Sequence, residues 1–233
     1  MALPKINLPI SELTLPSNGK KIKYRPFTVK EEKILLVAQE SGEAENEVLA
    51  MKQIINNCMI DYSIDDIALF DFEYVYLTLR ARSVDNLAKF VIKDPDTGEE
   101  VQLELDMTDI EVYREEGHTN EVKINDDYTL FLKYPNVDSF IKIIAANEND
   151  PLVNYFIMVA CLDTLASEDE VHSFKDYSDE EVEEFMDGLS GDVIRDITTF
   201  FETMPKIRKE LPYTNSEGKE QTFVVEGTRS FFI

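Results

Sequence analysis

The chain has 233 residues, of which 43% are hydrophobic and 10% aromatic. This length and composition suit one large domain or two small ones with a packed core, and they argue against a disordered chain. Forty-seven acidic residues face 23 lysines and arginines, which gives a formal net charge of -24. Because such a surface repels phosphates, neither nucleic acid nor an anionic membrane is an expected partner.

The chain lacks the sequence features of secretion and membrane insertion. Its first residues contain no long apolar stretch of the signal-peptide type, and no segment approaches the ~20 apolar residues of a membrane span. The only cysteines, Cys58 and Cys161, lie in apolar helical patterns. We therefore predict buried free thiols and a soluble protein made in a reducing cytosol.

The first segment, residues 1–84, is predicted to be a hairpin followed by a helical unit. Rough alternation of apolar residues on both sides of the turn signal at 16–19 indicates two strands. Thr28 and Glu31 have the spacing of a capping box, which marks a helix start. The three helices predicted from apolar periodicity cover residues 28–41, 45–60 and 71–83.

In the second segment, residues 85–135, the apolar period changes from helical to two. The strands expected from this alternation cover residues 87–93, 101–107, 121–124 and 128–134. Polar turns separate them into two hairpins. Together the hairpins predict a small antiparallel sheet with one face in water.

The third segment, residues 136–233, returns to a mostly helical pattern. Its predicted elements are helices at 137–146 and 151–162, a short strand at 170–174, helices capped by Ser178 and Ser190, and a hairpin at 207–225. The predicted fold class is α+β, with helical N- and C-terminal parts flanking small antiparallel hairpins. The three segments are the predicted domains.

No motif for catalysis, metal binding or cofactor binding is present. The two histidines, His118 and His172, have no serine or cysteine at triad spacing, and the metal and phosphate-loop motifs are absent. We predict no catalytic, metal-binding or cofactor-binding residues, no cofactor and no small-molecule substrate. A hydrolase with an acidic or metal-dependent site stays open as an alternative, because 47 acids offer many chance carboxylate pairs.

Two polar turns resemble each other in spacing. Residues 94–100 read Asp-x-x-Thr-Gly-x-Glu, and residues 214–220 read Thr-x-x-Glu-Gly-x-Glu. The spacing matches the knuckle of a zinc ribbon in which every cysteine has been replaced, so a closed zinc site cannot form. The prediction is two ordinary hairpins, and the alternative is the relic of a lost ribbon.

Two further segments are candidates for contact surfaces, either with the rest of the chain or with another protein. The chain ends in Phe231, Phe232 and Ile233, and leaving them in water would forfeit roughly 1.5–3 kcal/mol of burial for each side chain. We expect this end to dock, either on the chain's own body or on another protein. Residues 163–187 contain eleven acids and one lysine. They predict a solvated acidic edge or a site for a basic partner.

Three stretches resemble the T4-like bacteriophage baseplate hub and hub-assembly proteins. They are residues 24–33 (YRPFTVKEEK), 79–84 (LRARSV) and 200–208 (FFETMPKIR), and the last precedes a hairpin and a terminal Phe-Phe. Asp85 stands where relatives usually have glycine, and this chain lacks the hairpin cysteines of some relatives. The resemblance covers nearly the whole chain in the right order.

The resemblance implies a non-enzymatic protein that works as a structural or chaperone-like assembly component of the central hub of a contractile tail. Implied partners are other baseplate hub and tail proteins, in the host cytoplasm during assembly and in the tail baseplate for a virion component. An inhibitor that mimics nucleic acid is a further alternative, because of the net charge. The residues expected to bind partners are Arg25, Phe27, Lys30, Arg80, Arg82, Phe231, Phe232 and Ile233.

Overall fold

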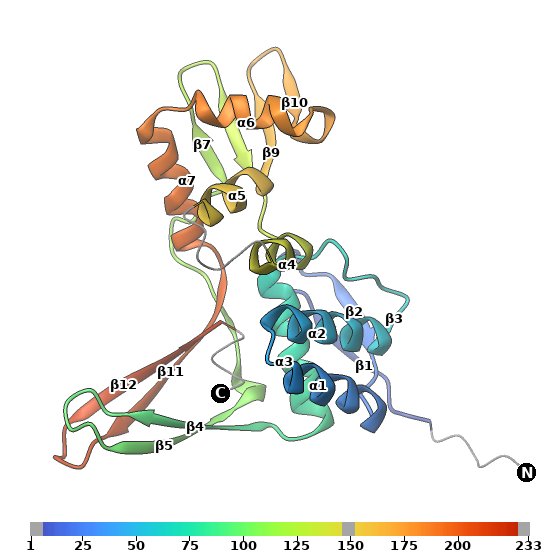
Figure 1. Ribbon diagram of the computed structural model, residues 1–233, viewed down its shortest axis with the longest axis vertical. Coiled ribbons are helices and arrows are strands. Elements are labelled where there is room, and N and C mark those ends of the chain that lie inside the picture. The colour runs from blue at the N-terminus through green and yellow to red at the C-terminus, as the bar shows by residue number, and fades with distance from the viewer. Residues whose placement is uncertain (1–6, 146–151, 228–233) are drawn as a thin grey trace, which may run out of the picture. The chain divides into compact units, whose positions relative to one another are not determined.

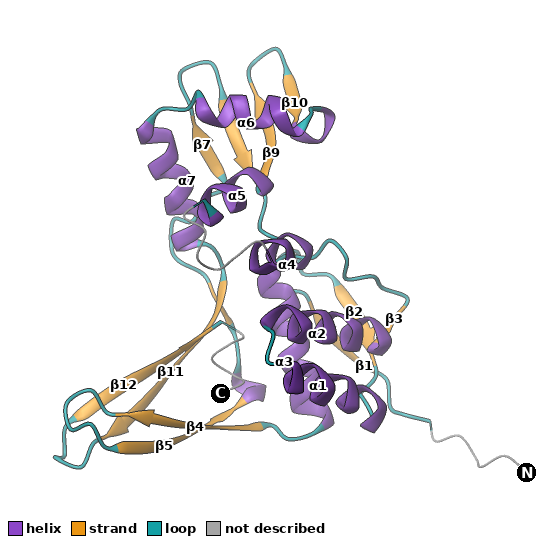
Figure 2. Cartoon of the chain, viewed as in Figure 1, coloured by secondary structure: helices purple, strands orange, loops and turns teal. Residues whose placement is uncertain are grey.

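The computed structural model describes residues 7–145 and 152–227, which form an α+β protein, as predicted (Figures 1 and 2). The chain divides into two compact units. The first combines residues 1–113 with 206–233, and the second is residues 114–205. This grouping cuts across the three predicted segments, because the hairpin at the end of the chain returns to the first unit.

The first unit begins with a three-stranded sheet and three helices (Figure 1). The antiparallel strands are β1 (Ser11–Thr14), β2 (Lys21–Tyr24) and β3 (Met59–Ile60), and the helices are α1 (Val29–Ser41), α2 (Ala44–Cys58) and α3 (Leu69–Ser83). The predicted hairpin and the three predicted helices are confirmed. The two-residue β3 is an addition, since a strand so short carries no period of its own.

Local capping and apolar packing hold these helices in place. The predicted capping box is present, since Glu31 Oε2 accepts a hydrogen bond of 2.9 Å from the backbone N–H of Thr28. Buried side chains of α2 and α3 supply much of the core, among them Ile54, Ile55, Cys58, Val75, Tyr76 and Leu79. Cys58 is a free and fully buried thiol, as expected, and its burial raises the pKa of the thiol to about 11.

Two long hairpins complete the first unit. Their strands are β4 (Leu87–Lys93) with β5 (Glu100–Asp106), and β11 (Lys206–Thr214) with β12 (Glu220–Glu226). The short helix η1 (Met107–Asp109) follows β5, and β6 (Val112–Tyr113) pairs with the start of β11. Phe90 of β4 and Phe223 of β12 lie with ring centroids 6.3 Å apart, so the two hairpins contact each other through apolar side chains.

The second unit is a four-stranded antiparallel sheet packed against helices. The strand order is β10 (Val171–Ser173), β9 (Leu162–Ala166), β8 (Thr129–Leu132) and β7 (Glu121–Lys123). The helical elements are α4 (Val137–Ala145), α5 (Val153–Ala160), η2 (Phe174–Asp176), α6 (Asp179–Asp187) and α7 (Gly191–Thr203). Side chains from the strands, α6 and α7 share one core, including Leu130, Leu132, Leu162, Met186, Ile197 and Phe200.

The prediction that both central hairpins belong to one sheet is wrong. The β4–β5 hairpin forms a two-stranded sheet of its own, whereas β7 and β8 pair within the four-stranded sheet. The reason is β9, which the sequence analysis missed and which occupies the free edge of β8. Its five residues directly follow an apolar helix, so periodicity alone could not separate the strand from that helix.

His118 lies in an aromatic stack of the second unit. Its ring is 5.7 Å from Tyr134 and 5.3 Å from Phe200, centroid to centroid. The hydroxyl of Thr203 donates to the carbonyl of Thr199, so it can only accept from His118 Nδ1–H, at 2.9 Å. Nε2 then accepts from the Tyr134 hydroxyl, at 3.0 Å. This neutral tautomer cannot take a proton from Thr203, and the histidine's role in the described contacts is packing.

The second unit is expected to lose stability in mild acid because of His118. Burial, followed by the nearby charge of Arg114, lowers the pKa of His118 below its ordinary value. The unfolded chain then binds the proton more readily, so stability is complete above pH ~6.5 and falls as the pH drops below it. The limiting slope for one proton is ~1.4 kcal/mol per pH unit. Urea unfolding between pH 7.5 and 5.5 measures it, and His118→Gln should flatten this dependence. An unchanged dependence in the variant would assign it to other groups.

Among the described residues, no helix combines the length and the apolar character needed to cross a membrane.

Candidate functional site

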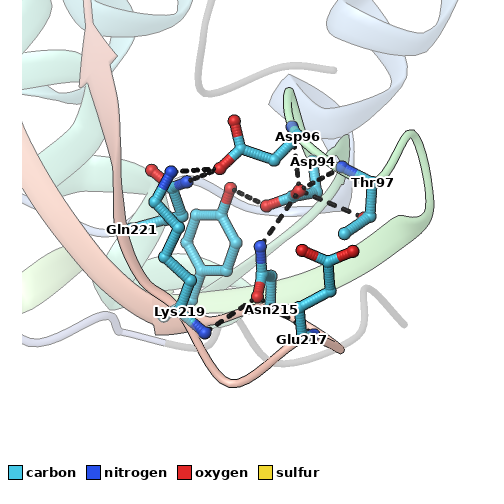
Figure 3. Close-up of polar contacts among 8 residues, drawn as sticks. Asp94, Asp96, Thr97, Asn215, Glu217, Lys219 and Gln221 are labelled. Atoms are coloured by element: carbon cyan, nitrogen blue, oxygen red, sulfur yellow. Dashed lines mark hydrogen bonds and ion pairs between the residues drawn. The ribbon is translucent and has the colours of Figure 1, made fainter.

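The tips of the two long hairpins meet through polar side chains (Figure 3). Asp94, at the turn after β4, is only 1% exposed. Its Oδ1 accepts hydrogen bonds from the backbone N–H groups of Asp96 and Thr97, at 3.0 and 2.8 Å. Its Oδ2 accepts a hydrogen bond of 2.8 Å from the hydroxyl of Tyr213, which is 119 positions away on β11. One carboxylate therefore shapes its own turn and reaches the opposite hairpin.

Asn215 forms the equivalent hydrogen bonds at the other tip. It is 5% exposed, and its Oδ1 accepts hydrogen bonds from the backbone N–H groups of Glu217 and Lys219, at 3.1 and 3.0 Å. Its Nδ2 points to Asp94 Oδ1 at 3.4 Å (Figure 3). The set of Asp94, Tyr213 and Asn215 is called the hairpin clamp below.

A second pair of contacts lies outside the hairpin clamp, at the surface. Asp96 Oδ2 accepts hydrogen bonds from the Lys219 ammonium group and from Gln221 Nε2, the latter at 2.6 Å (Figure 3). The side chains of Lys219 and Asp96 are 62% and 38% exposed, so solvent screens this ion pair and its contribution to stability is small. The buried carboxylate, rather than the exposed one, is the main link between the tips.

The hydrogen bonds to Asp94 keep it ionised. Burial by itself raises the pKa of this carboxyl, but the donors from Thr97, Tyr213 and Asp96 outweigh burial and hold the pKa at about 2. Burial and the nearby Asp94 carboxylate raise the pKa of Tyr213, which stays a neutral donor. The hairpin clamp therefore combines one charged acceptor with neutral donors. Hydrogen bonds to a charged acceptor are stronger than hydrogen bonds between two neutral groups.

The two similar turns noted in the sequence are thus brought together, as the two knuckles of a ribbon would be. Hydrogen bonds join them, and no group of three or more metal-ligating side chains stands in a binding arrangement among the described residues. The arrangement joins the tips of the two hairpins through hydrogen bonds.

Arg25 forms a second polar link, at the start of α1. Its guanidinium donates to the Glu31 carboxylate at 3.1 Å and to the backbone carbonyl of Asn57 at 2.9 Å. Glu31 is 1% exposed. Burial raises the pKa of Glu31, yet hydrogen bonds from Arg25 and Thr28 lower it to about 2. The pair connects the end of β2, the start of α1 and the end of α2.

The other predicted partner-binding residues are distributed over the first unit. Phe27 is buried, Lys30 is exposed on α1, and Arg80 is half-buried on α3. Arg82 is exposed and lines a hollow of about 320 Å³ together with Glu12 and other residues. Phe231, Phe232 and Ile233 lie outside the described residues. The backbone N–H of Phe27 donates to Ser83 Oγ at 2.9 Å, so the structure joins the motif at 24–33 to the motif that holds Arg80 and Arg82. Partner binding by these residues stays a prediction.

The outer surface of α1 carries apolar side chains next to Lys30. Val29, Leu36 and Val37 are each more than half exposed. Val29 and Leu36 lie seven positions apart, which places them on the same face of the helix. An apolar patch beside a lysine is a feature of protein-binding surfaces.

A match to a family model identifies the family of the chain. The model described as "T4 bacteriophage base plate protein" matches residues 8–233, which is nearly the whole chain. The chain belongs to this family. The base plate family is the one that the motifs at 24–33, 79–84 and 200–208 resemble, so the resemblance is confirmed at the level of a T4-like baseplate protein. No curated protein and no solved structure matches the chain.

Sequence reasoning missed the hairpin clamp of this base plate protein. Asp94 and Asn215 are 121 positions apart, and the residues of one turn do not predict which other turn it contacts. The available signal was the similarity of the two turns. It showed related local geometry without showing that they meet.

Proposed function

We propose that this base plate protein is a non-enzymatic component of the central hub of a contractile tail, with a structural or an assembly role, and that it acts by binding other tail proteins. The family match over residues 8–233 carries the proposal. The hub-type motif at 24–33 supports the hub as the location within the baseplate.

The described surfaces suggest how the residues divide the work. Arg25 and Phe27 have internal contacts, so we propose that they shape the surface around α1. Lys30 and Arg82 are exposed, and we propose that they contact partners directly. The apolar end of the chain, Phe231 to Ile233, is the third proposed contact.

Purification from infected cells tests the proposed function. The tagged full-length chain should co-purify with other baseplate hub proteins. A variant that lacks residues 227–233 should lose most of this binding while keeping the circular dichroism spectrum and the melting temperature of the full chain. If the full chain recovers no tail protein, the proposed function is wrong. If the shortened chain binds equally well, the apolar end is not a contact.

The same proposal allows a permanent or a transient role. Mass spectrometry of purified virions separates the two. A subunit of the hub remains in the finished tail at a fixed ratio to other hub proteins. An assembly chaperone binds hub proteins in the host cytoplasm and is missing from the virion.

A further inference from the structure

A groove with an apolar floor lies on the second unit. It has a volume of about 310 Å³, and its floor is formed by Leu165 of β9, Phe174 of η2, and Val182 and Phe185 of α6. Cavities of this size are at the lower end of the ~300–1,000 Å³ that ligand pockets occupy. There is room for one or two large side chains of a partner.

The rim of the groove is aromatic. Tyr177 is 42% exposed, and its hydroxyl lies 2.7 Å from His172 Nδ1, so the two rings are fixed beside each other. A fixed aromatic rim over an apolar floor is the form that receives an anchoring side chain at protein interfaces.

The charge around the groove is predominantly negative. All of its lining residues except Tyr128 lie in the stretch 163–187, which holds eleven acids and one lysine, Lys175. The whole second unit, residues 114–205, has 22 acids and six lysines and arginines, a net charge of -16 out of the chain's -24. The negative charge is therefore concentrated in the unit that bears the groove.

We propose that this groove binds a basic segment of another tail protein, with one aromatic or branched aliphatic side chain inserted between Tyr177 and Phe185. Lysines or arginines on both sides of the anchor pair with the acids at the groove, Glu181, which lines it, and Glu170, which contacts His172. The inference rests on the proposed binding function and adds the chemical class of the partner. Apolar burial holds the anchor, while the charges attract the segment and select against acidic ones.

Other occupants fit less well. Nucleic acid and anionic lipid are repelled by the acids around the groove. Residues 228–233 of the chain itself have apolar side chains, but they hold only one base, Arg229. A segment with an excess of positive charge complements the surface better.

The test uses the full-length chain and a fluorescein-labelled synthetic peptide of lysines and arginines with one phenylalanine and one leucine at its centre. A control peptide has serines in place of these two residues. In fluorescence anisotropy at 0.15 M salt, the apolar-centred peptide should bind at least tenfold more tightly than the serine peptide. Equal binding would show attraction by charge alone and would overturn the anchor.

Variants locate the binding. Tyr177→Ala should lower the affinity for the apolar-centred peptide about tenfold. Phe156→Ala, which truncates an aromatic side chain of equal 42% exposure on α5, should leave binding unchanged. The double variant Glu170→Gln and Glu181→Gln should also weaken binding, and glutamine at 181 can keep the capping box with Ser178. The same change at the exposed Glu121 and Glu202 should have a smaller effect. Equal effects of the groove variants and their controls would overturn the proposal.

Two further arms separate the remaining outcomes. If the variant without residues 227–233 binds the peptide much more tightly than the full chain, the chain's own end occupies the groove and the proposed partner is wrong. Purification of Tyr177→Ala from infected cells then separates this inference from the proposed function. Loss of one tail protein from the purified complex supports the groove. Complete recovery of every tail protein refutes the groove and leaves the proposed function in place.

Discussion

Glu31→Ala is expected to lower the free energy of unfolding of the first unit by about 3 kcal/mol. Removal of one partner from a buried ion pair costs roughly 3–5 kcal/mol, and partial exposure of Arg25 reduces that figure. The variant also loses the carboxylate that completes the capping box with Thr28, and an N-cap contributes about 1 kcal/mol. Urea unfolding followed by circular dichroism measures the change.

Glu12→Ala is the matched control for this ion pair. Glu12 pairs with Lys23 at 3.9 Å, and both side chains are more than half exposed. Such surface pairs contribute at most ~1 kcal/mol, so the control should unfold almost like the wild type. Equal losses in the two variants would contradict a special role for the Arg25–Glu31 pair.

Asn215→Ala is expected to destabilise the hairpin clamp by about 1–2 kcal/mol. The substitution removes the side-chain acceptor of the backbone N–H groups of Glu217 and Lys219. These residues are exposed, so water replaces part of the lost bonds, and each ordinary hydrogen bond contributes about 1 kcal/mol. Hydrogen exchange of β11 and β12 amides reports the loss, since the hairpin should open more often.

Asn215→Asp separates the turn from the contact between hairpins. An aspartate keeps both acceptor bonds of its own turn but places a second carboxylate beside Asp94, where Asn215 Nδ2 lies at 3.4 Å from Oδ1. Like charges at this distance repel, so the variant should be destabilised at neutral pH and should lose less stability than the wild type as the pH falls below ~4. Behaviour equal to that of the wild type at all pH values would mean that the tips do not depend on each other.

Much of the local structure could be predicted because its causes are local. The capping boxes at Thr28 and Ser178 lie within four residues of sequence, and both are present in the structure. Alternating apolar residues placed β5, and a turn with glycine placed the tip between β11 and β12. In each case the residues that determine the element are neighbours in the chain.

The pairing of distant elements could not be predicted in the same way. The strand β9 has five residues, and only Cys161 separates it from the apolar helix α5. Once β9 is missed, β8 has an empty edge, and the neighbouring hairpin β4–β5 becomes the apparent partner. The sequence holds the alternation of each strand, but the partner of a strand is determined by packing across the unit.

The candidate site shows the same limit. Arg25 is in a motif that indicates the family, and the sequence analysis predicted that it binds another protein. The structure shows that its guanidinium contacts Glu31 and Asn57 of the same chain. A motif can identify a family through residues that maintain its fold. The groove at Tyr177 lies in the acidic stretch that the sequence did single out, although its apolar floor depends on β9.

The pairing of β6 with β11 has a consequence for synthesis. Tyr113 and Lys206 are partners in this ladder, so the chain leaves the first unit and re-enters it at neighbouring positions. A ribosome that makes the protein from its N-terminus completes all of residues 114–205 before β11 exists. The intervening unit can therefore acquire its own fold while the outer one still lacks two strands. The strands β11 and β12, with their half of the tip contacts, are made only after the whole of the second unit.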